Sequence, residues 1–247
     1  MPSSWSVLCL VDDPARVTRR QVHGLVCSWV EHVFPKELHD HGIKPFSVAG
    51  LRTVDGLLSF DVRLLLDPLT EVLADGVRES AVRGAELGTQ RARLLPFPDG
   101  ELIAAEAVAS WRDLLAQPVR RWGVELRTLT TFRIGREYDP DPTPVRVLGH
   151  LRSRWSAFAP DDLRYLTHTP LDRMGLAEAS RQLERVVDRA YQHDVRGVTG
   201  RVEQRADAAG EDDAAAIGGW LALAHFAGIG YGTSRGYGET VVTSLAA

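Results

Sequence analysis

The sequence predicts an α+β protein made of two tandem ferredoxin-like (RRM-like) units, each with the element order β-α-β-β-α-β, packed around a central groove. Two observations lead to this prediction. Apolar residues follow strand and helix spacing in that order once before residue 118 and again after it. The length, 247 residues, suits two domains of about 120 residues. We therefore expect domains at residues 1–117 and 118–247, with an extended polymer held in the groove between the two sheets.

The first half opens with a strand expected over residues 6–11. Thr18 and Gln21 fit a capping box, and the apolar face that follows continues to Val33, which predicts a helix. Two strands of a hairpin are expected at 44–51 and 57–66, a short helix at 68–77 and a strand at 89–97. Residues 99–117 are interpreted as a helix-rich connector that ends before Pro118.

The second half repeats the order. A strand is expected over 123–134 and a helix over 145–158, with the Pro- and Asp-rich residues 138–144 between them as irregular chain. Strands are expected at 184–194, where a helix is also possible, and at 197–204. A helix over 213–226 and a final strand over 240–245 flank a segment rich in glycine.

Residues 227–239, here called the glycine segment, have the sequence AGIGYGTSRGYGE, with five glycines within eleven residues. Such a backbone can approach a ligand closely, and hydroxyl and guanidinium groups beside it suit phosphate. A helix cap followed by a tight turn is the simpler interpretation, but one or two glycines suffice for that. The segment is therefore a candidate RNA-binding element. Its candidate residues are Gly228, Gly230, Gly232, Thr233, Ser234, Arg235, Gly236 and Gly238.

The order of elements around the glycine segment excludes a nucleotide cofactor. A dinucleotide fingerprint places its glycines after a strand and before a helix, whereas here the helix comes first. The Lys-Ser/Thr pair of an ATP-binding loop is also missing. We expect no cofactor.

Composition narrows the class of protein further. A net charge of −4 argues against indiscriminate nucleic-acid binding but leaves room for a local basic track. Cys9 and Cys27 lie in apolar runs and are expected to be small buried hydrophobes. The sequence shows no signal peptide and no apolar run long enough for a membrane span, so a cytoplasmic protein is expected.

Eight histidines are present, and three of them, His32, His39 and His41, cluster together. His32 borders the apolar face of the first helix, which explains it as a helix-surface residue. His39 and His41 fall in a loop where functional side chains are typically displayed, and Lys44 follows the turn at Gly42. His39, His41 and Lys44 are therefore the candidate catalytic residues.

This set of residue types suits RNA cleavage by the substrate's own 2′-hydroxyl. The reaction needs a base, an acid for the leaving 5′ oxygen and a cation for the charge that develops on phosphorus. Histidine can serve as base or acid, and lysine can stabilise the charge. A metal site is the alternative, because His39 and His41 could act as ligands with Glu37 and Asp40 nearby, but no further ligand stands at a recognisable spacing.

Four sequence stretches together resemble one known family, the CRISPR-associated endoribonucleases that cut precursor repeat RNA, which belong to the RAMP superfamily. The matching stretches are residues 38–51, residues 142–160 with Pro-Thr-Pro and Arg-Trp-Ser-Ala-Phe-Ala-Pro, residues 197–200 with Gly-Val-Thr-Gly, and residues 227–238 with Ala-Gly-x-Gly-x-x-Thr-x-x-Gly-x-Gly. The resemblance spans nearly the whole chain.

The resemblance implies two ferredoxin-like domains and metal-independent cleavage of precursor repeat RNA to make crRNA, leaving 2′,3′-cyclic phosphate and 5′-hydroxyl ends. It makes His39 the catalytic histidine and Lys44 its cationic helper, while the glycine segment holds RNA or braces the domain interface. Some members add a tyrosine from the first helix, whereas no tyrosine precedes Tyr138 here. A repeat-RNA-binding subunit of a CRISPR effector complex, without catalytic activity, is the alternative function.

RNA affinity is expected to come mainly from contacts with phosphates. The candidate arginines are Arg19, Arg20, Arg52, Arg152, Arg154 and Arg235. For each of them a solvated surface charge is the alternative interpretation. The expected partners are CRISPR repeat RNA, subunits of a CRISPR effector complex, and a second copy of the chain in a homodimer.

Overall fold

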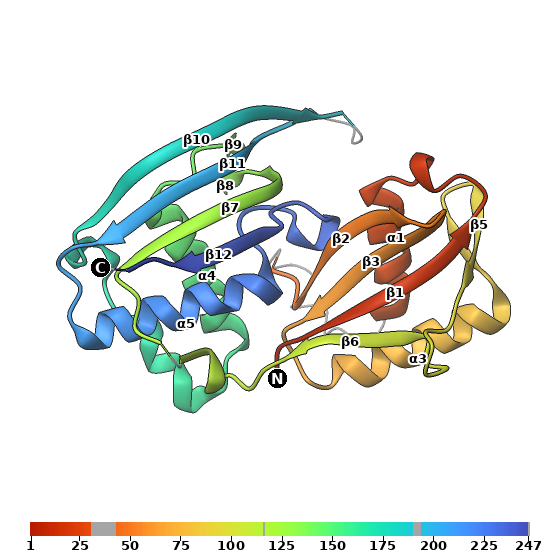
Figure 1. Cartoon of the computed structure of the whole chain (residues 1–247). Helices are drawn as coiled ribbons and strands as arrows, with labels where there is room; N and C mark the ends of the chain where they lie inside the picture. The colour runs from red at the N-terminus through yellow and green to blue at the C-terminus, as the bar shows by residue number, and fades with distance from the viewer. Residues whose placement is uncertain (31–42, 116, 190–193, 247) are drawn as a thin grey trace. The chain divides into compact units, whose positions relative to one another are not determined.

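A computed structural model describes residues 1–30, 43–115, 117–189 and 194–246. The chain divides into two compact units: unit 1 is Met1–Val108 with Ser234–Gly236, and unit 2 is Ala109–Thr233 with Tyr237–Ala247. Each unit contains helices and a sheet whose described strand pairs all run antiparallel (Figure 1). The predicted α+β class and the repeated ferredoxin-like order are confirmed.

Unit 1 has the predicted order β-α-β-β-α-β, with the last strand replaced by several short ones. Its sheet has the strand order β2-β3-β1-β5-β4, and β6 also pairs with β1. Its elements are β1 (Ser3–Val11), α1 (Arg19–Val30), β2 (Phe46–Val54), β3 (Leu57–Leu64), α3 (Leu69–Arg83), β4 (Ala85–Leu87), β5 (Gln90–Leu94), β6 (Ile103–Val108) and the 3₁₀ helix η1 (Pro14–Arg16).

Helix α1 begins as its capping box predicts. The backbone N–H of Thr18 donates to Oε1 of Gln21 at 2.8 Å, and the backbone N–H of Gln21 donates to Oγ1 of Thr18 at 3.4 Å. The buried face of α1, from Val22 to Val30, joins one core with the inward residues of β1, β2 and β3 and with Leu69, Leu73 and Val77 of α3. Burial of these apolar side chains fixes both helices against one face of the sheet.

The expectation of a helix-rich connector at 99–117 is wrong. Residues 103–108 form strand β6, which pairs antiparallel with Ser3–Val7 of β1, while β5 pairs with Cys9–Val11 of the same strand. Three alanines in Ile103–Val108 favour a helix locally. The backbone groups of β1 need partners along this edge, and that tertiary requirement decides in favour of a strand.

Unit 2 repeats the topology. Its four-stranded sheet has the order β10-β11-β7-β12, and a separate hairpin pairs β8 with β9. Its elements are η3 (Asp113–Leu115), β7 (Arg121–Thr130), β8 (Phe132–Ile134), β9 (Glu137–Asp139), α4 (Pro144–Phe158), η4 (Asp161–His168), η5 (Leu171–Arg173), β10 (Leu176–Asp188), β11 (Val195–Ala206), α5 (Glu211–Ala227) and β12 (Thr240–Ser244). The short 3₁₀ helix η6 (Thr233–Arg235) begins in unit 2, and its last two residues belong to unit 1.

Two details of unit 2 differ from the sequence prediction. Strand β10 runs from Leu176 to Asp188 and pairs with β11, so a strand is confirmed over 184–188 of the expected segment, but it begins eight residues earlier than predicted. Short strand β9 occupies residues that were expected to be irregular, because Phe132, Arg133 and Ile134 supply a partner strand for them. Both differences come from pairing with a second strand, which local periodicity does not reveal.

The core of unit 2 is built around tryptophans. Trp155 of α4 packs edge-on against Trp111, with ring centroids 5.1 Å apart, and donates its indole N–H to the carbonyl oxygen of Leu163 at 3.0 Å. Helix α5 is buried on most of its surface, as expected for a helix that is apolar all round. This burial fixes the end of α5, and with it the start of the glycine segment.

In the part of the chain that the structure describes, every helix is too short or too polar to cross a membrane.

Candidate nucleic-acid interface

The glycine segment connects α5 to β12 through an unusual backbone path. All five of its glycines have positive φ angles, between +66° and +96°. At Gly238, where φ is +66°, an added Cβ would lie only 2.0 Å from the carbonyl oxygen of Ile229. At Gly230, where φ is +96°, it would lie 2.5 Å from the carbonyl oxygen of Thr131. The glycines are therefore required by backbone-to-backbone contact as well as by conformation.

Hydrogen bonds tie the glycine segment to itself and to the end of β7. The N–H of Ile229 donates to the carbonyl of Gly238 at 2.8 Å, and the N–H of Gly238 donates to the carbonyl of Leu129 at 2.9 Å. The N–H of Tyr231 donates to the carbonyl of Thr131 at 2.6 Å. Because these amides already have partners inside unit 2, this part of the segment acts as a brace rather than as a cradle for phosphate.

A buried polar pair holds the middle of the segment. The guanidinium Nη2 of Arg154 donates to Oγ1 of Thr233 at 2.8 Å, and the two residues are exposed by only 6 % and 1 %. Burial lowers the pKa of Arg154 to about 10. Its guanidinium is thus directed into unit 2, and we assign Arg154 a bracing role instead of the RNA contact that the sequence suggested. This hydrogen bond joins Arg154 and Thr233, which both belong to the stretches that resemble the family.

Residues Ser234–Gly236 pack in unit 1, against the first turns of α1. Nδ1 of His23 lies 2.8 Å from the carbonyl oxygen of Ser234, and since a carbonyl can only accept, Nδ1 carries the proton. A Cβ on Gly236 would lie 3.0 Å from Cδ of Arg19. Arg19, half-buried, and Arg235 of the glycine segment are therefore both positioned within unit 1 beside the same turn of α1.

His23 is a candidate that the sequence reasoning missed. Its ring stacks on Phe46 at the start of β2, with ring centroids 6.3 Å apart, and its Nε2 lies 3.4 Å from Sγ of Cys27. The only signal in the sequence is that it sits one turn before Cys27 on a polar side of α1. Cys27 is half-buried, whereas Cys9 is fully buried, and burial raises the pKa of the Cys9 thiol to about 12.

The segment expected to carry His39 and His41, here called the histidine loop, belongs to residues 31–42. His32, His39 and His41 lie outside the described residues, while Lys44 is half-buried in the short approach to β2. Lys44 stands two residues before Phe46, the ring on which His23 stacks. The assignment of His39, His41 and Lys44 as catalytic residues stays a prediction.

The other candidate arginines fall into two environments. On unit 1, Arg20 is exposed near the start of α1, and Arg52 of β2 is about half exposed, with Nη1 2.9 Å from the carbonyl of Gly50. On unit 2, Arg152 is half-buried and donates from Nη1 to the carbonyl of Thr169 at 3.0 Å. Arg20 and Arg52 are therefore better placed than Arg152 to contact phosphate from the surface.

His150 is a second residue with a marked environment, on α4 one turn before Arg154. Its Nε2 is shielded from water and has no hydrogen-bond partner among the described residues, although the residue as a whole is half-buried. Burial, followed by the positive charge of Arg154, lowers the pKa of His150 to about 3. A neutral imidazole in this position has a structural role in unit 2.

Comparison with known proteins gives a consistent answer. The family model described as CRISPR-associated endoribonuclease Cas6 matches residues 124–240. The product complex of a Cas6 protein (TTHB231) matches with a TM-score of 0.80 and 27 % identity, covering 98 % of this chain and 100 % of the other. The chain is similar to Cas6 proteins in sequence over residues 124–240 and in fold over nearly its whole length, and we call it Cas6-type in that sense.

Further solved structures agree with this assignment. A structure of Thermus thermophilus Cas6 (TTHB231) matches with a TM-score of 0.68 and 26 % identity over 98 % of each chain. A RAMP protein that binds different RNA substrates matches with a TM-score of 0.60 over 98 % of this chain and 100 % of the other, and at 12 % identity this supports the fold alone. Comparison with curated protein sequences gave no significant match.

The extent of the Cas6 family match is informative. It begins in β7 and ends at the first residue of β12, so it includes the glycine segment, Thr233 and Arg154. It does not include the histidine loop or Lys44. The sequence family therefore supports the braced glycine segment, while the catalytic assignment in this Cas6-type chain depends on the loop after α1.

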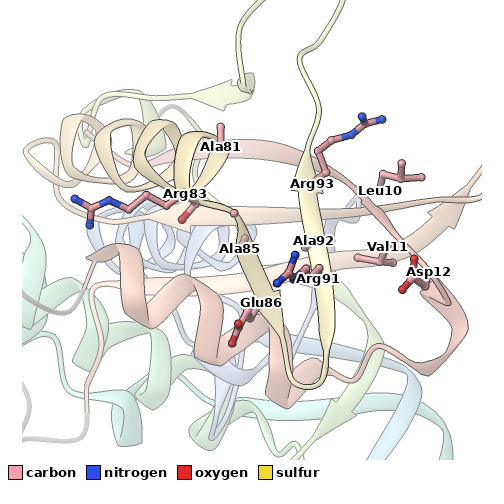
Figure 2. A pocket seen from close by; sticks show the side chains of 12 residues that line it. Leu10, Val11, Asp12, Ala81, Arg83, Ala85, Glu86, Arg91, Ala92 and Arg93 are labelled. Carbon is pink, nitrogen blue, oxygen red and sulfur yellow. The ribbon is translucent and has the colours of Figure 1, made fainter.

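Unit 1 of this Cas6-type protein also carries hollows on its surface. One, of about 530 Å³, lies where β4 and β5 meet the ends of β1 and α3, and Figure 2 shows Arg91, Arg93 and Glu86 among its lining residues. It contains none of the predicted site residues, and its rim mixes arginine with Asp12 and Glu86. A second hollow, of about 460 Å³, is lined in part by Arg20. The charged residues that line these two hollows do not indicate which kind of ligand would bind there.

Among the described residues, no three His, Cys, Asp or Glu side chains gather in a way that could hold a metal ion. The alternative pair of ligands, His39 and His41, falls outside these residues, so the proposed metal site is not tested.

Proposed function

We propose that this Cas6-type protein is an endoribonuclease that binds CRISPR repeat RNA and cleaves the precursor transcript to produce crRNA. The observation that carries the proposal is the match over 98 % of the chain to a Cas6 product complex, at a TM-score of 0.80, together with the Cas6 family match to unit 2. Both ferredoxin-like units of the chain are included in the structural match.

The proposed reaction needs no group beyond the protein and the RNA. The 2′-hydroxyl loses its proton to a base, and its oxygen forms a bond to the adjacent phosphorus. The bond from phosphorus to the 5′ oxygen breaks, and that oxygen takes a proton from an acid, which leaves a 2′,3′-cyclic phosphate and a 5′-hydroxyl. A well-placed imidazole typically contributes about 10²–10⁴-fold to such a proton transfer.

We assign the acid–base role to His39, with His41 as the alternative, and the stabilisation of phosphorane charge to Lys44. These residues supply the imidazole and ammonium groups in one loop and at its end. Lys44 lies two residues before the start of β2, so a rigid strand would restrict the position of its backbone. The glycine segment supports the proposal because it lies within the part of the chain that matches the Cas6 family model.

Incubation of the protein with its cognate repeat RNA in EDTA tests the proposal. We expect cleavage at one bond, a product with a 2′,3′-cyclic phosphate, and no cleavage of RNA that carries a 2′-deoxy nucleotide at the mapped position. His39→Ala should lower the single-turnover rate by at least about 100-fold. His168→Ala, an exposed histidine of η4, is the matched control and should cleave like the unmodified protein.

Other results would point elsewhere. If the protein binds repeat RNA tightly and leaves the RNA uncleaved, and if His39→Ala does not change this binding, the result would favour a non-catalytic subunit of an effector complex. Activity that disappears in EDTA and returns with a divalent metal would favour the His39–His41 metal site instead.

A further inference from the structure

An aromatic and cationic cluster lies in unit 2 beside the glycine segment. The rings of Tyr138 and Tyr231 have centroids 5.3 Å apart at an interplanar angle of 57°. The guanidinium carbon of Arg133 lies 5.8 Å from the centroid of Tyr231. We call Arg133, Tyr138 and Tyr231 the tyrosine platform. None of these three residues belongs to the site predicted from the sequence.

Two local features of the sequence build the tyrosine platform. Strands β8 and β9 form a hairpin in which Arg133 and Tyr138 stand directly opposite each other. The turn of this hairpin contains Gly135, whose φ is +62°. The third member, Tyr231, comes from the glycine segment, and its N–H bond to Thr131, just before β8, holds it at the base of the hairpin.

The glycine before Tyr231 explains how the two segments approach so closely. A side chain at Gly230 would meet the carbonyl oxygen of Thr131 at 2.5 Å, so only glycine permits the contact between the segment and the hairpin. The platform is consequently fixed to the braced part of the glycine segment.

Exposure separates this cluster from an ordinary core contact. Tyr138 and Tyr231 are both half-buried, and the hairpin residues from Arg133 to Glu137 are exposed. Ile134 in the hairpin is 53 % exposed. The rings therefore keep part of their surface accessible at the edge of an exposed hairpin.

The charges around the platform favour an anionic polymer. Arg133 and Arg136 are exposed on the hairpin, and the carboxylate of Asp139 is paired with Nη2 of Arg146 at 2.5 Å. Glu137 is the opposing acidic residue on the hairpin. Aromatic faces combined with guanidinium groups are the usual means by which proteins stack unpaired bases while contacting the phosphates that connect them.

We propose that the tyrosine platform stacks an unpaired base of the bound RNA. This inference rests on the proposed function, since it names a subsite for the same RNA. In this proposal Tyr231 and Tyr138 stack on the base, and Arg133 supplies the positive charge beside them. The platform selects for a single-stranded nucleotide, because a base within a helix cannot present its face to a ring.

Fluorescence of 2-aminopurine tests the proposal. Repeat RNAs carry the analogue at one unpaired position each, and a 2′-deoxy nucleotide at the mapped cleavage site keeps the RNA intact. We expect one position to be quenched on binding, and Tyr231→Leu to abolish that quenching and to weaken binding by about 5- to 150-fold, as a lost stacking contact predicts. Tyr231→Phe keeps the ring and should retain the quenching.

The matched control is Tyr165→Leu, which removes a tyrosine of η4 that is 60 % exposed in the same unit. It should leave both quenching and affinity unchanged. Tyr138→Leu should act like Tyr231→Leu, and thermal unfolding of each variant shows whether unit 2 has kept its fold. If Tyr231→Leu unfolds, the comparison rests on Tyr138→Leu and on Arg133→Gln.

Failure of this inference is distinct from failure of the proposed function. Normal cleavage and affinity with unchanged quenching in the folded tyrosine variants would overturn the platform and leave the endoribonuclease intact. Binding of repeat RNA without quenching at any unpaired position would also overturn it. Absence of repeat-RNA binding by the unmodified protein would overturn the proposed function and the platform together.

Discussion

At the scale of single residues, two polar side chains of unit 2 with marked environments lie on one helix. Arg154 donates to Thr233 from a buried position, and His150, one turn earlier on α4, presents a nitrogen that has no hydrogen-bond partner in the described chain. A buried imidazole beside a guanidinium stays neutral, since a second positive charge there would be both unsolvated and repelled. Arg154 thus braces the glycine segment through Thr233, while His150 contributes an uncharged side chain to the same helix.

The neutral state of His150 predicts a dependence of stability on pH. Its pKa is about 3 in the folded chain, against an ordinary value of about 6.5 when unfolded. Its contribution is therefore fully present above pH 6.5 and is lost as the pH falls from 6.5 toward 3, where the unfolded chain binds the extra proton. Between pH 7 and pH 5 we expect this residue to lower the free energy of unfolding by up to about 2 kcal/mol.

Urea unfolding at pH 7 and at pH 5 measures this effect. His150→Leu should lose less stability between the two pH values than the unmodified protein does. His168→Leu, at an exposed position of η4, should keep the original pH dependence. Equal acid sensitivity in His150→Leu and His168→Leu would contradict a buried neutral imidazole.

At the scale of elements, the glycine segment is a brace whose path is dictated by backbone contacts. Its hydrogen bonds to Leu129 and Thr131 at the end of β7 fix where Tyr231 and Thr233 are displayed. The pattern of five glycines predicted a functional loop from the sequence, and their positive φ angles explain why no other residue type serves. Which amides would be occupied by the chain itself was not predictable, because their partners lie about a hundred residues away.

Gly238 provides the test of this brace. In Gly238→Ala the new methyl group would meet the carbonyl oxygen of Ile229 at 2.0 Å in a backbone conformation of positive φ. The clash and the strained conformation together should lower the free energy of unfolding by about 2–5 kcal/mol. Gly56→Ala is the matched control, because Gly56 has a φ of +77° with open space around it, and it should cost only about 1–2 kcal/mol.

Denaturant unfolding compares the two variants directly. The midpoint of Gly238→Ala should fall clearly below that of Gly56→Ala. Equal midpoints would show that the contact between Gly238 and Ile229 is looser than the structure gives.

The secondary structure was predicted wrongly where pairing with another strand determined it, as in β6 and β9. Strand β6 has an alanine-rich sequence that reads locally as helix, and it is extended because β1 needs a partner along that edge. Strand β9 owes its existence to β8 in the same way. By contrast, α1 was predicted down to its capping box, because Thr18 and Gln21 act within one turn.

At the scale of the whole molecule, the net charge of −4 means that RNA affinity must come from local groups of arginine. Such binding weakens as salt rises, because each phosphate contact releases counterions. Arg20 is an exposed member of the predicted set at the start of α1. Its contribution can be read from the slope of affinity against salt.

We expect Arg20→Gln to reduce the slope of log affinity against log salt by about 0.7–0.9, the value for one lost phosphate contact. Filter binding of 2′-deoxy-blocked repeat RNA at several salt concentrations measures it. Arg78→Gln is the control, because Arg78 is an exposed arginine of α3 that pairs with Asp75. A slope that is unchanged in Arg20→Gln, or one that falls equally in Arg78→Gln, would remove Arg20 from the interface.

The sequence by itself determined the repeated β-α-β-β-α-β order, the resemblance to the repeat-RNA endoribonucleases and the importance of the glycine segment. These follow from local periodicity and from motifs whose residues are close together in the chain. Only the tertiary structure decided that Arg154 is internal, that His23 lies against Ser234, and that Tyr138 and Tyr231 meet. The physical reason is that burial and contact between distant segments depend on how strands pair and helices pack, which no local pattern encodes.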